Sequence, residues 1–319
     1  MIRISRAHLQ VAALTHPGLT GRQNEDRFAV SAFRLSEANP TPSVFAILSD
    51  GIGGHRAGEV AAEIAVEAIS RMVEQSDAGE PLATLNHAVQ ATSELIAAKA
   101  KDDTQRLGMG TTCACAWVIE DKLFTASVGD SRIYLLRGEQ IHQLTVDHTW
   151  VQEAVEKGIL PADQARVHPN LHVIRRYLGS STPPQADLRM RLAKDESDTQ
   201  SRSHQGLRLI PGDVLLLCSD GLTDLVEADE IWEAVHAAIS SGSPAGLGLK
   251  SAAQALVNLA TSRGGPDNIT VVLLAVPAYP AHKKRGRPSP WLVGGLLGFC
   301  LLLAVLLVLA ILAFHVPLP

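Results

Sequence analysis

Residues 44–51 read Val-Phe-Ala-Ile-Leu-Ser-Asp-Gly, and residues 214–221 repeat the pattern as Val-Leu-Leu-Leu-Cys-Ser-Asp-Gly. Each stretch is an apolar run of strand length that leads directly into an aspartate and a glycine. A third apolar run ends at Val128-Gly129-Asp130. The end of a strand holds a side chain firmly, and glycine lets a backbone carbonyl or a ligand come close. The pattern therefore predicts a strand-rich domain that presents carboxylates at its strand ends.

The sequence around these runs predicts further strands and several helices. The strands are short apolar runs, and the helices carry apolar residues at intervals of three and four. The predicted strands are Val44–Leu48, Thr112–Ile119, Leu123–Val128, Ile133–Leu136, Val214–Cys218 and Ile269–Val276. The predicted helices are Gly58–Val73, Pro81–Lys101, Glu230–Ile239 and Leu249–Thr261. Together they make residues 1–276 one domain of mixed α and β structure.

Three connecting segments carry weaker signals. Residues 129–132, Gly-Asp-Ser-Arg, join two predicted strands, which suits a turn between adjacent antiparallel strands better than a helical crossover. Residues 151–176 carry a glycine and two prolines beside a short helical patch, so we expect an irregular segment. Residues 194–206 are charged and serine-rich without an apolar pattern, and we expect a solvated hairpin loop there.

The charge of the chain is unevenly distributed. The 319 residues are 46% hydrophobic and 19% charged, which is enough apolar material for a folded core. Four of the 28 Lys and Arg residues lie at 283–287, which leaves 24 against 33 Asp and Glu residues, or a net charge of −9, in residues 1–282. Nucleic acid as a partner would require a basic face, whereas an acidic domain suits metal cations.

The C-terminal segment has the composition of a membrane span. Residues 291–314 contain no charged side chain, and about 20 apolar residues cross a bilayer core of roughly 30 Å. A buried core helix is the alternative, but such a helix rarely follows a proline-rich basic linker like residues 277–290 at a chain end. Because positive residues stay cytoplasmic, we expect a single-pass inner-membrane protein with residues 1–282 in the cytoplasm and residues 315–319 as a short tail. No signal peptide is expected, since residues 1–14 lack a long apolar run.

Further acidic residues accompany the carboxylates at the strand ends. Glu25 and Asp26 occur near the start of the chain, and Asp267 precedes the last predicted strand. Carboxylates without nearby lysines repel one another unless a cation lies between them. Ligation by oxygen alone selects Mg²⁺ or Mn²⁺, and two such ions can share a bridging water and hold a phosphoryl group for in-line attack. A single Asp-Gly pair can be only a turn, but the whole set favours a metal site.

A series of short motifs follows in a fixed order along residues 8–276. The motifs are Thr15-His-Pro-Gly, Asn24-Glu25-Asp26-Arg27, Ser49-Asp50-Gly51-Ile52-Gly53-Gly54-His55-Arg56-Ala57-Gly58-Glu59, Gly108-Met109-Gly110-Thr111-Thr112, Val128-Gly129-Asp130-Ser131-Arg132, Asp147-His148, Ser219-Asp220-Gly221-Leu222 and Gly264-Gly265-Pro266-Asp267-Asn268-Ile269-Thr270. One of them alone is weak, but the ordered series resembles the metal-dependent serine/threonine protein phosphatases of type 2C, in their bacterial branch.

The resemblance implies a fold and a set of metal ligands. The fold would be a four-layer α-β-β-α sandwich of two antiparallel sheets, to which residues 291–314 would add one transmembrane helix. Asp50 would bridge two Mn²⁺ or Mg²⁺ ions, and Gly51 would offer its carbonyl to one of them. Asp220 and Asp267 would complete the shell of the other ion. The attacking group would then be a water activated by both metals, with no nucleophile from the protein.

Other residues receive supporting roles from the same resemblance. Asp26, a catalytic residue together with Asp50, would hold metal-bound water, and Glu25 would assist it. Asp130 would share a third ion with Asp220. Residues 151–176 would form the mobile flap beside the site, where they would affect the choice of substrate.

The sequence departs from the family pattern at two positions. An arginine that contacts substrate phosphate usually stands three residues before the asparagine of the Asn-Glu-Asp motif, where this chain has Gly21. Arg22 follows it, and its forked guanidinium could bind the phosphate from a shifted loop, or it could be an ordinary exposed arginine. Ile52 stands where some eukaryotic relatives have a histidine proposed as general acid. His55 is close in sequence but is expected to be structural, so no general acid is assigned.

The resemblance also implies partners. The substrates would be proteins phosphorylated on serine or threonine by bacterial kinases, and the membrane would be a second partner. Two alternatives stay open: a non-catalytic phosphoprotein-binding module of the same fold, suggested by the two departures, and a small-molecule phosphohydrolase that uses the same metals. Phosphopeptide binding without release of phosphate would identify the former, and a preference for free phosphate esters the latter.

Overall fold

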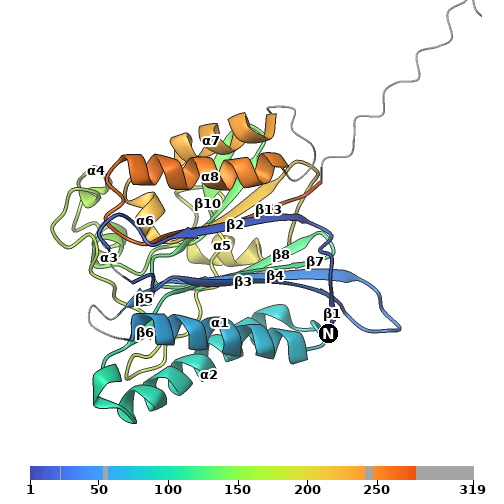
Figure 1. Cartoon of the computed structure of the whole chain (residues 1–319), viewed down its shortest axis with the longest axis horizontal. Coiled ribbons are helices and arrows are strands. Elements are labelled where there is room, and N and C mark those ends of the chain that lie inside the picture. The colour runs from blue at the N-terminus through green and yellow to red at the C-terminus, as the bar shows by residue number, and fades with distance from the viewer. Residues whose placement is uncertain (22, 53–56, 241–246, 278–319) are drawn as a thin grey trace, which may run out of the picture. The chain divides into compact units, whose positions relative to one another are not determined.

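The computed structural model of the chain describes residues 1–21, 23–52, 57–240 and 247–277. The described part of residues 1–277 contains two large antiparallel sheets packed face to face and one small sheet (Figure 1). The six-stranded sheet has the order β1 (Ile2–Ile4), β3 (Arg27–Arg34), β4 (Pro42–Ser49), β7 (Cys113–Ile119), β8 (Lys122–Val128), β11 (Leu207–Arg208). The five-stranded sheet has the order β10 (Gln140–Gln143), β9 (Arg132–Arg137), β12 (Val214–Cys218), β13 (Ile269–Ala275), β2 (Gln10–His16). The small sheet pairs β5 (Gly51–Ile52) with β6 (Gly110–Thr111).

The central strands are buried on both faces. In β4, Val44, Ala46 and Leu48 point into the layer between the two large sheets. Phe45 and Ile47, on the opposite face of the same strand, pack in the layer beneath the helices. Because successive side chains alternate between faces, a strand covered on both sides must be apolar at almost every position. This burial explains the uninterrupted apolar runs of the sequence.

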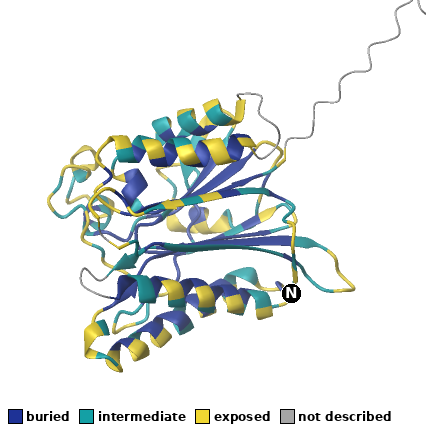
Figure 2. Cartoon of the chain, in the orientation of Figure 1, coloured by how far each residue is buried: buried dark blue, intermediate teal, exposed yellow. Residues whose placement is uncertain are grey.

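Two pairs of helices cover the outer faces of the sheets. The six-stranded sheet packs against α1 (Gly58–Gln75) and α2 (Pro81–Lys101), and the five-stranded sheet packs against α7 (Ala228–Ser240) and α8 (Leu247–Ser262). Figure 2 shows buried positions along the strands and exposed positions on the outer sides of these helices. The predicted four-layer α+β sandwich is therefore confirmed. Short helices lie in the connections: η1 (Thr104–Arg106), α3 (Trp150–Glu156), α4 (Ala162–Ala165), α5 (Asp198–Ser203) and α6 (Asp220–Thr223).

The predicted helices and central strands all exist, with ends that differ by a few residues at most. The sequence reasoning missed β1, β2, β3, β5, β6, β10 and β11. Most residues of β2 and β3 are only half-buried. Such strands need fewer apolar residues, so the apolar run that identified the central strands is absent from them.

The predicted turn between adjacent strands at residues 129–132 is wrong. β8 pairs with β7 and β11 in the six-stranded sheet, whereas β9 pairs with β10 and β12 in the other sheet. The chain therefore crosses from one sheet to the other at these residues. A short connection fits this crossing as well as a hairpin, because the two sheets are stacked directly on each other.

The predicted solvated loop at residues 194–206 is also wrong in part, because α5 occupies its centre. Ser197 and Gln200 form a capping box: each side chain bonds the backbone at the other end of the first turn. This reciprocal bonding satisfies N–H groups that a short helix otherwise leaves unpaired. The Ser-x-x-Gln spacing was the available signal, and no apolar pattern accompanied it.

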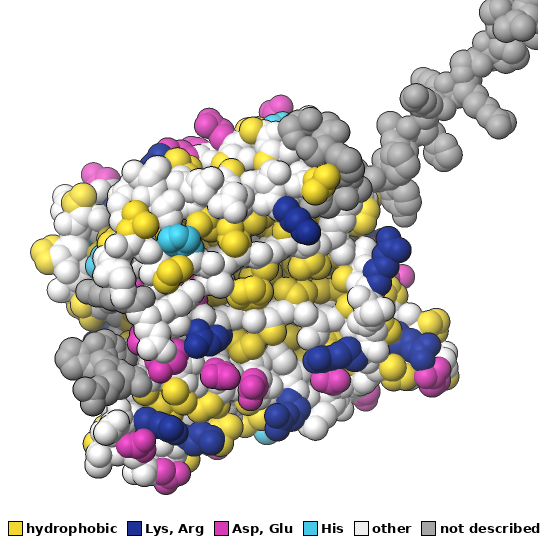
Figure 3. All heavy atoms as spheres, viewed as in Figure 1, with side chains coloured by type: hydrophobic (Ala, Val, Ile, Leu, Met, Phe, Trp, Pro, Cys, Tyr) yellow, Lys and Arg dark blue, Asp and Glu magenta, His cyan; other side chains and the backbone are white. Residues whose placement is uncertain are grey.

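Among the described residues, no helix combines the length and the hydropathy needed to cross a bilayer. The predicted span at 291–314 and tail at 315–319 lie outside the described residues, as does the linker beyond residue 277. On the face of the domain shown in Figure 3, apolar side chains gather in a band between the two sheets. Basic and acidic side chains intermingle below that band, without a patch of one sign.

Leu217 tests the packing between the sheets. Its side chain on β12 is fully buried, so Leu217→Ala should leave a cavity and lower the free energy of unfolding by about 2–5 kcal/mol. The measurement is denaturant unfolding of the full chain. Ile159→Ala is the control, because Ile159 is 69% exposed and its loss should change stability by less than about 0.5 kcal/mol. Equal losses for both variants would contradict this packing.

Candidate active site

Five aspartates gather at one end of the sandwich because of where their strands begin and end. Asp26 precedes β3 and Asp50 follows β4, and these antiparallel strands pair Arg27 with Ser49. In the other sheet, Asp220 follows β12 and Asp267 precedes β13, with Cys218 paired to Val271. Asp130 lies on the crossing between the sheets. We call Asp26, Asp50, Asp130, Asp220 and Asp267 the carboxylate site.

Hydrogen bonds from one sheet to the other hold this end together. The Ser219 hydroxyl donates to Asp26 Oδ2 at 2.8 Å and accepts from the Thr270 N–H at 3.0 Å. The side chain of Asn268 also links the sheets, since its Oδ1 accepts from the Glu25 N–H at 2.8 Å. Ser219 and Asn268 thus fix the approach of Asp26 and Glu25 to the strands that carry Asp220 and Asp267.

Two threonines position Asp50. The Asp50 N–H donates to Thr112 Oγ1 at 2.9 Å, and the Asp50 carbonyl accepts from Thr111 Oγ1 at 2.7 Å. The same Thr112 hydroxyl lies 2.7 Å from that of Ser131, the neighbour of Asp130. The Gly-Thr-Thr motif therefore connects the loop of Asp50 to the crossing that carries Asp130.

Gly51 lies where the start of α1 leaves no room for a side chain. A Cβ on Gly51 would overlap the backbone of Gly58. A Cβ on Gly58 would in turn meet the carboxylate of Glu25, with Oε2 at 2.5 Å. Glu25 therefore lies beside the N-terminus of α1, where the helix dipole favours a negative charge.

The carboxylates raise one another's proton affinity. Burial is the main cause and raises the pKa of Asp26 to about 6 and that of Asp130 to about 7. Burial, followed by repulsion from the other aspartates of the carboxylate site, raises the pKa of Asp50 and of Asp220 well above the usual range. Side chains in this state hold either protons or cations.

Two oxygens of the carboxylate site have no hydrogen-bond partner among the described residues. Asp26 Oδ1 and Asp130 Oδ1 are both buried and unpaired. An unpaired buried acceptor costs free energy unless a ligand satisfies it. An all-oxygen set with open acceptors fits Mg²⁺ or Mn²⁺.

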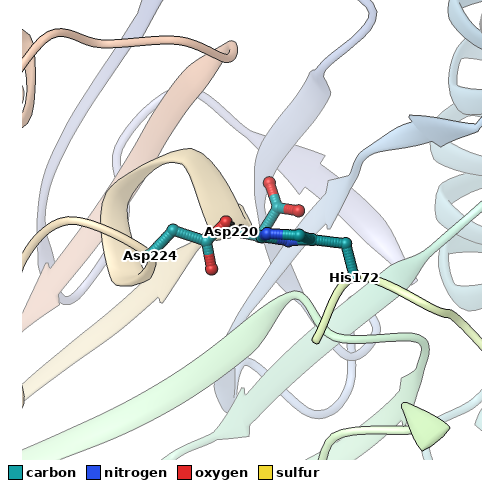
Figure 4. Close-up of side chains that lie close together, drawn as sticks. All are labelled: His172, Asp220 and Asp224. Atoms are coloured by element: carbon teal, nitrogen blue, oxygen red, sulfur yellow. Dashed lines mark ion pairs between the residues drawn. The ribbon is translucent and has the colours of Figure 1, made fainter. Parts of the chain in front are cut away.

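The structure adds two residues that the sequence reasoning missed. Asp224, the C-cap residue of α6, follows Asp220 by four residues, so the two carboxylates share one face. His172 reaches this pair from the flap (Figure 4), with Nδ1 3.3 Å from Asp224 Oδ2. The spacing of four was a readable signal for Asp224, but nothing local marked His172. Arg166, also in the flap, donates to the Thr223 carbonyl at 3.2 Å and pairs with Glu227.

The structure does not describe two of the residues that the sequence singled out. Arg22 and His55 lie outside the described residues. Ile52 ends the short strand β5, and an alkyl side chain there can donate no proton. Asp267 is exposed, and its Oδ1 accepts from the Asn268 N–H at 2.8 Å.

Comparison with known proteins identifies relatives of this chain. The family model of protein phosphatase 2C matches residues 19–259. The serine/threonine protein phosphatase PstP of Mycobacterium tuberculosis is 34% identical over 291 residues, or 91% of this chain, but the chain spans only 48% of that relative's length. Protein phosphatase PhpP of Streptococcus pneumoniae is 32% identical over 271 residues, which are 84% of this chain and 98% of PhpP.

A solved structure agrees with the sequence relatives. The catalytic domain of serine/threonine protein phosphatase PstP, crystallised in complex with two manganese ions, superposes with a TM-score of 0.66. It is 32% identical, and the alignment covers 84% of this chain and 97% of that one. The residues matched by the family model include β3 to α7 and most of α8. They contain every member of the carboxylate site except Asp267. The chain belongs to the protein phosphatase 2C family.

Proposed function

We propose that the chain is a metal-dependent protein serine/threonine phosphatase that hydrolyses phosphoserine and phosphothreonine. The observation that carries the proposal is the carboxylate site, in which aspartates from both sheets converge and the buried Asp26 and Asp130 each keep one unpaired oxygen. Family membership and the manganese ions bound by PstP support it. A site of this kind needs cations to hold its charge together.

The resemblance to the family supports an assignment of the ligands. Asp50 would bridge two Mn²⁺ or Mg²⁺ ions, with the Gly51 carbonyl, Asp220 and Asp267 completing their shells. Asp26 and Glu25 would orient water in the same space, and Asp130 would hold a third ion together with Asp220. When bound, the ions supply an activated water for attack on phosphorus and neutralise the charge of the phosphate.

The residues around the site suggest how a substrate is held. Arg22, next to the Asn-Glu-Asp motif, is the candidate for gripping the phosphate. The flap borders the site through the contacts of Arg166 and His172 with the α6 region. Its exposed side chains Ile159 and Val167 offer apolar contacts for the residues around a phosphoserine, so this segment would influence the choice of substrate.

The biological setting is part of the proposal. Phosphorylated products of bacterial Ser/Thr kinases are the proposed substrates. Residues 291–314 would anchor the chain in the inner membrane with the phosphatase domain in the cytoplasm, and tethering would raise the local concentration of membrane-bound targets.

The activity is tested on the full chain with Mn²⁺ and a phosphothreonine peptide. Asp50→Asn and Asp220→Asn should each lower kcat roughly a thousandfold, because each removes a charged ligand of the ions. His204→Asn is the control: it breaks a pair of 3.1 Å between His204 and the Glu196 carboxylate, which lie at the two ends of α5, and it should leave kcat unchanged. Peptide binding without phosphate release would instead support the binding module. Faster turnover of free phosphate esters than of phosphoproteins would support the small-molecule phosphohydrolase.

The raised pKa values predict how stability depends on pH without metal. A carboxyl whose folded pKa is raised stabilises the fold below its unfolded pKa, and this stability is lost as pH rises through the folded value. Asp26 and Asp130, with pKa values of about 6 and 7, should therefore make the metal-free protein less stable at pH 8 than at pH 5, by on the order of 3 kcal/mol. Thermal unfolding in chelator measures this.

Mn²⁺ should reverse the loss at pH 8, where the carboxylates are ionised and free to bind it. The increase in Tm on adding Mn²⁺ should be larger at pH 8 than at pH 5. Asp50→Asn should reduce both the pH dependence and the Mn²⁺ effect. A metal-free protein that is as stable at pH 8 as at pH 5 would contradict the burial of these charges.

The membrane anchor is tested by exchanging residues 291–319 for a soluble tail. The exchanged protein should move from the membrane fraction to the soluble fraction and keep its peptide phosphatase activity. Dephosphorylation of membrane-bound targets in cells should weaken, because the enzyme no longer shares their surface. An unchanged fractionation would rule out the anchor.

A further inference from the structure

A buried polar network lies behind Asp130, outside the carboxylate site. It contains His148, Asp187 and Arg189, whose exposed fractions are 3%, 6% and 8%. None of them belongs to the ligands assigned above. Burying three such groups is costly unless every polar atom is paired, so their contacts identify what the network holds in place.

The network is bonded to the residue before Asp130. The Gly129 N–H donates to His148 Nδ1 at 3.1 Å, and the His148 N–H donates to the Gly129 carbonyl at 2.9 Å. Because Nδ1 accepts, the imidazole proton is on Nε2, which lies 3.1 Å from Asp187 Oδ2 and donates to it. The His148 ring is thus hydrogen-bonded to Gly129 on one side and to Asp187 on the other.

Asp187 is itself held fast. Its carboxylate accepts from the Arg189 side chain through both Nε and Nη2, and its backbone pairs with Ser127 of β8. Burial raises the pKa of Asp187, but hydrogen bonds from His148 and Arg189 outweigh burial and lower it well below the usual range. Asp187 is therefore a permanent anion that keeps the His148 ring in one tautomer and one orientation.

The crossing needs such support because its backbone is unusual. Gly129 has φ +102°, and a Cβ there would lie 2.6 Å from the Thr112 side chain. The side chain of Asp130 gives little anchorage of its own, because its buried Oδ1 has no hydrogen-bond partner among the described residues. The hydrogen bond between Ser131 and Thr112 secures the residue after Asp130, and His148 secures the residue before it.

We propose that His148 and Asp187 are positioning residues, which aim the Asp130 carboxylate at the cation that it would share with Asp220. The inference rests on the proposed function, because that function gives Asp130 its cation. Arg189 also donates to the largely exposed carboxylate of Asp198 at 3.1 Å.

Two substitutions of His148 separate its two bonds. In His148→Asn the amide oxygen takes the place of Nδ1 and can still accept from Gly129, but the side chain cannot reach Asp187. In His148→Gln the amide nitrogen takes the place of Nε2 and can still donate to Asp187, but the Gly129 N–H loses its acceptor. If the bond to Gly129 positions Asp130, His148→Gln should be the more damaging.

The readout is Mn²⁺ binding to the full chain by titration calorimetry, with thermal unfolding measured alongside. The site in question is the one that Asp130→Ala removes from the isotherm. Its affinity should fall about tenfold in His148→Gln and in Asp187→Asn, and by less than about threefold in His148→Asn. In the Asp130→Ala background, His148→Gln should cause no further change. His204→Asn, in a pair of equal length away from the site, should bind Mn²⁺ like the wild type.

Several results would overturn the inference. They are an isotherm that Asp130→Ala does not alter, equal affinities in His148→Gln and His148→Asn, or a full effect of His148→Gln without Asp130. If Asp187→Asn fails to fold, the two His148 variants still decide. A chain that binds Mn²⁺ as expected but releases no phosphate would reject the phosphatase and leave the positioning role intact.

Discussion

Like charges held out of water repel, and the active end of this molecule is built around that repulsion. Asp26, Asp50, Asp130 and Asp220 each raise the proton affinity of a neighbour or are raised by one, with burial as the main cause. The carboxylates do not separate, because their backbones are fixed by strand pairing and by hydrogen bonds from Ser219 and Thr112. The rest of the domain can be understood as the scaffold that holds these charges together until a cation neutralises them.

The scaffold meets this demand through the double burial of its central strands. Such strands are packed on both faces and move little, so residues at their ends inherit a defined position. The flap contacts the α6 region through polar side chains that include Arg166 and His172.

The sequence predicted most of this scaffold for a physical reason. Strands covered on both sides must be apolar throughout, so β4, β7, β12 and β13 were legible, and the Asp-Gly pairs after two of them marked the site. β2 and β3 are half-buried and carry a weaker pattern. Local patterns also cannot say which sheet a strand joins, which is why the crossing after β8 was mistaken for a hairpin.

The residues of the candidate site were also predicted only in part. Residues next to strand ends were found, whereas partners brought in by the fold were not: His172 comes from the flap, and Asp187 pairs with His148 from 39 positions away. A short motif records the residues that a strand positions. It does not record those that meet them from another layer.

The crossing of the chain at residues 129–131 has a mechanical consequence. Asp26 and Asp50 belong to one sheet, Asp220 and Asp267 belong to the other, and Asp130 sits on the covalent strap between them. Ions bound among these residues would cross-link the two sheets. Any movement of one sheet relative to the other would break bonds to the ions. The backbone at this end of the domain should therefore fluctuate less with ions bound than without them.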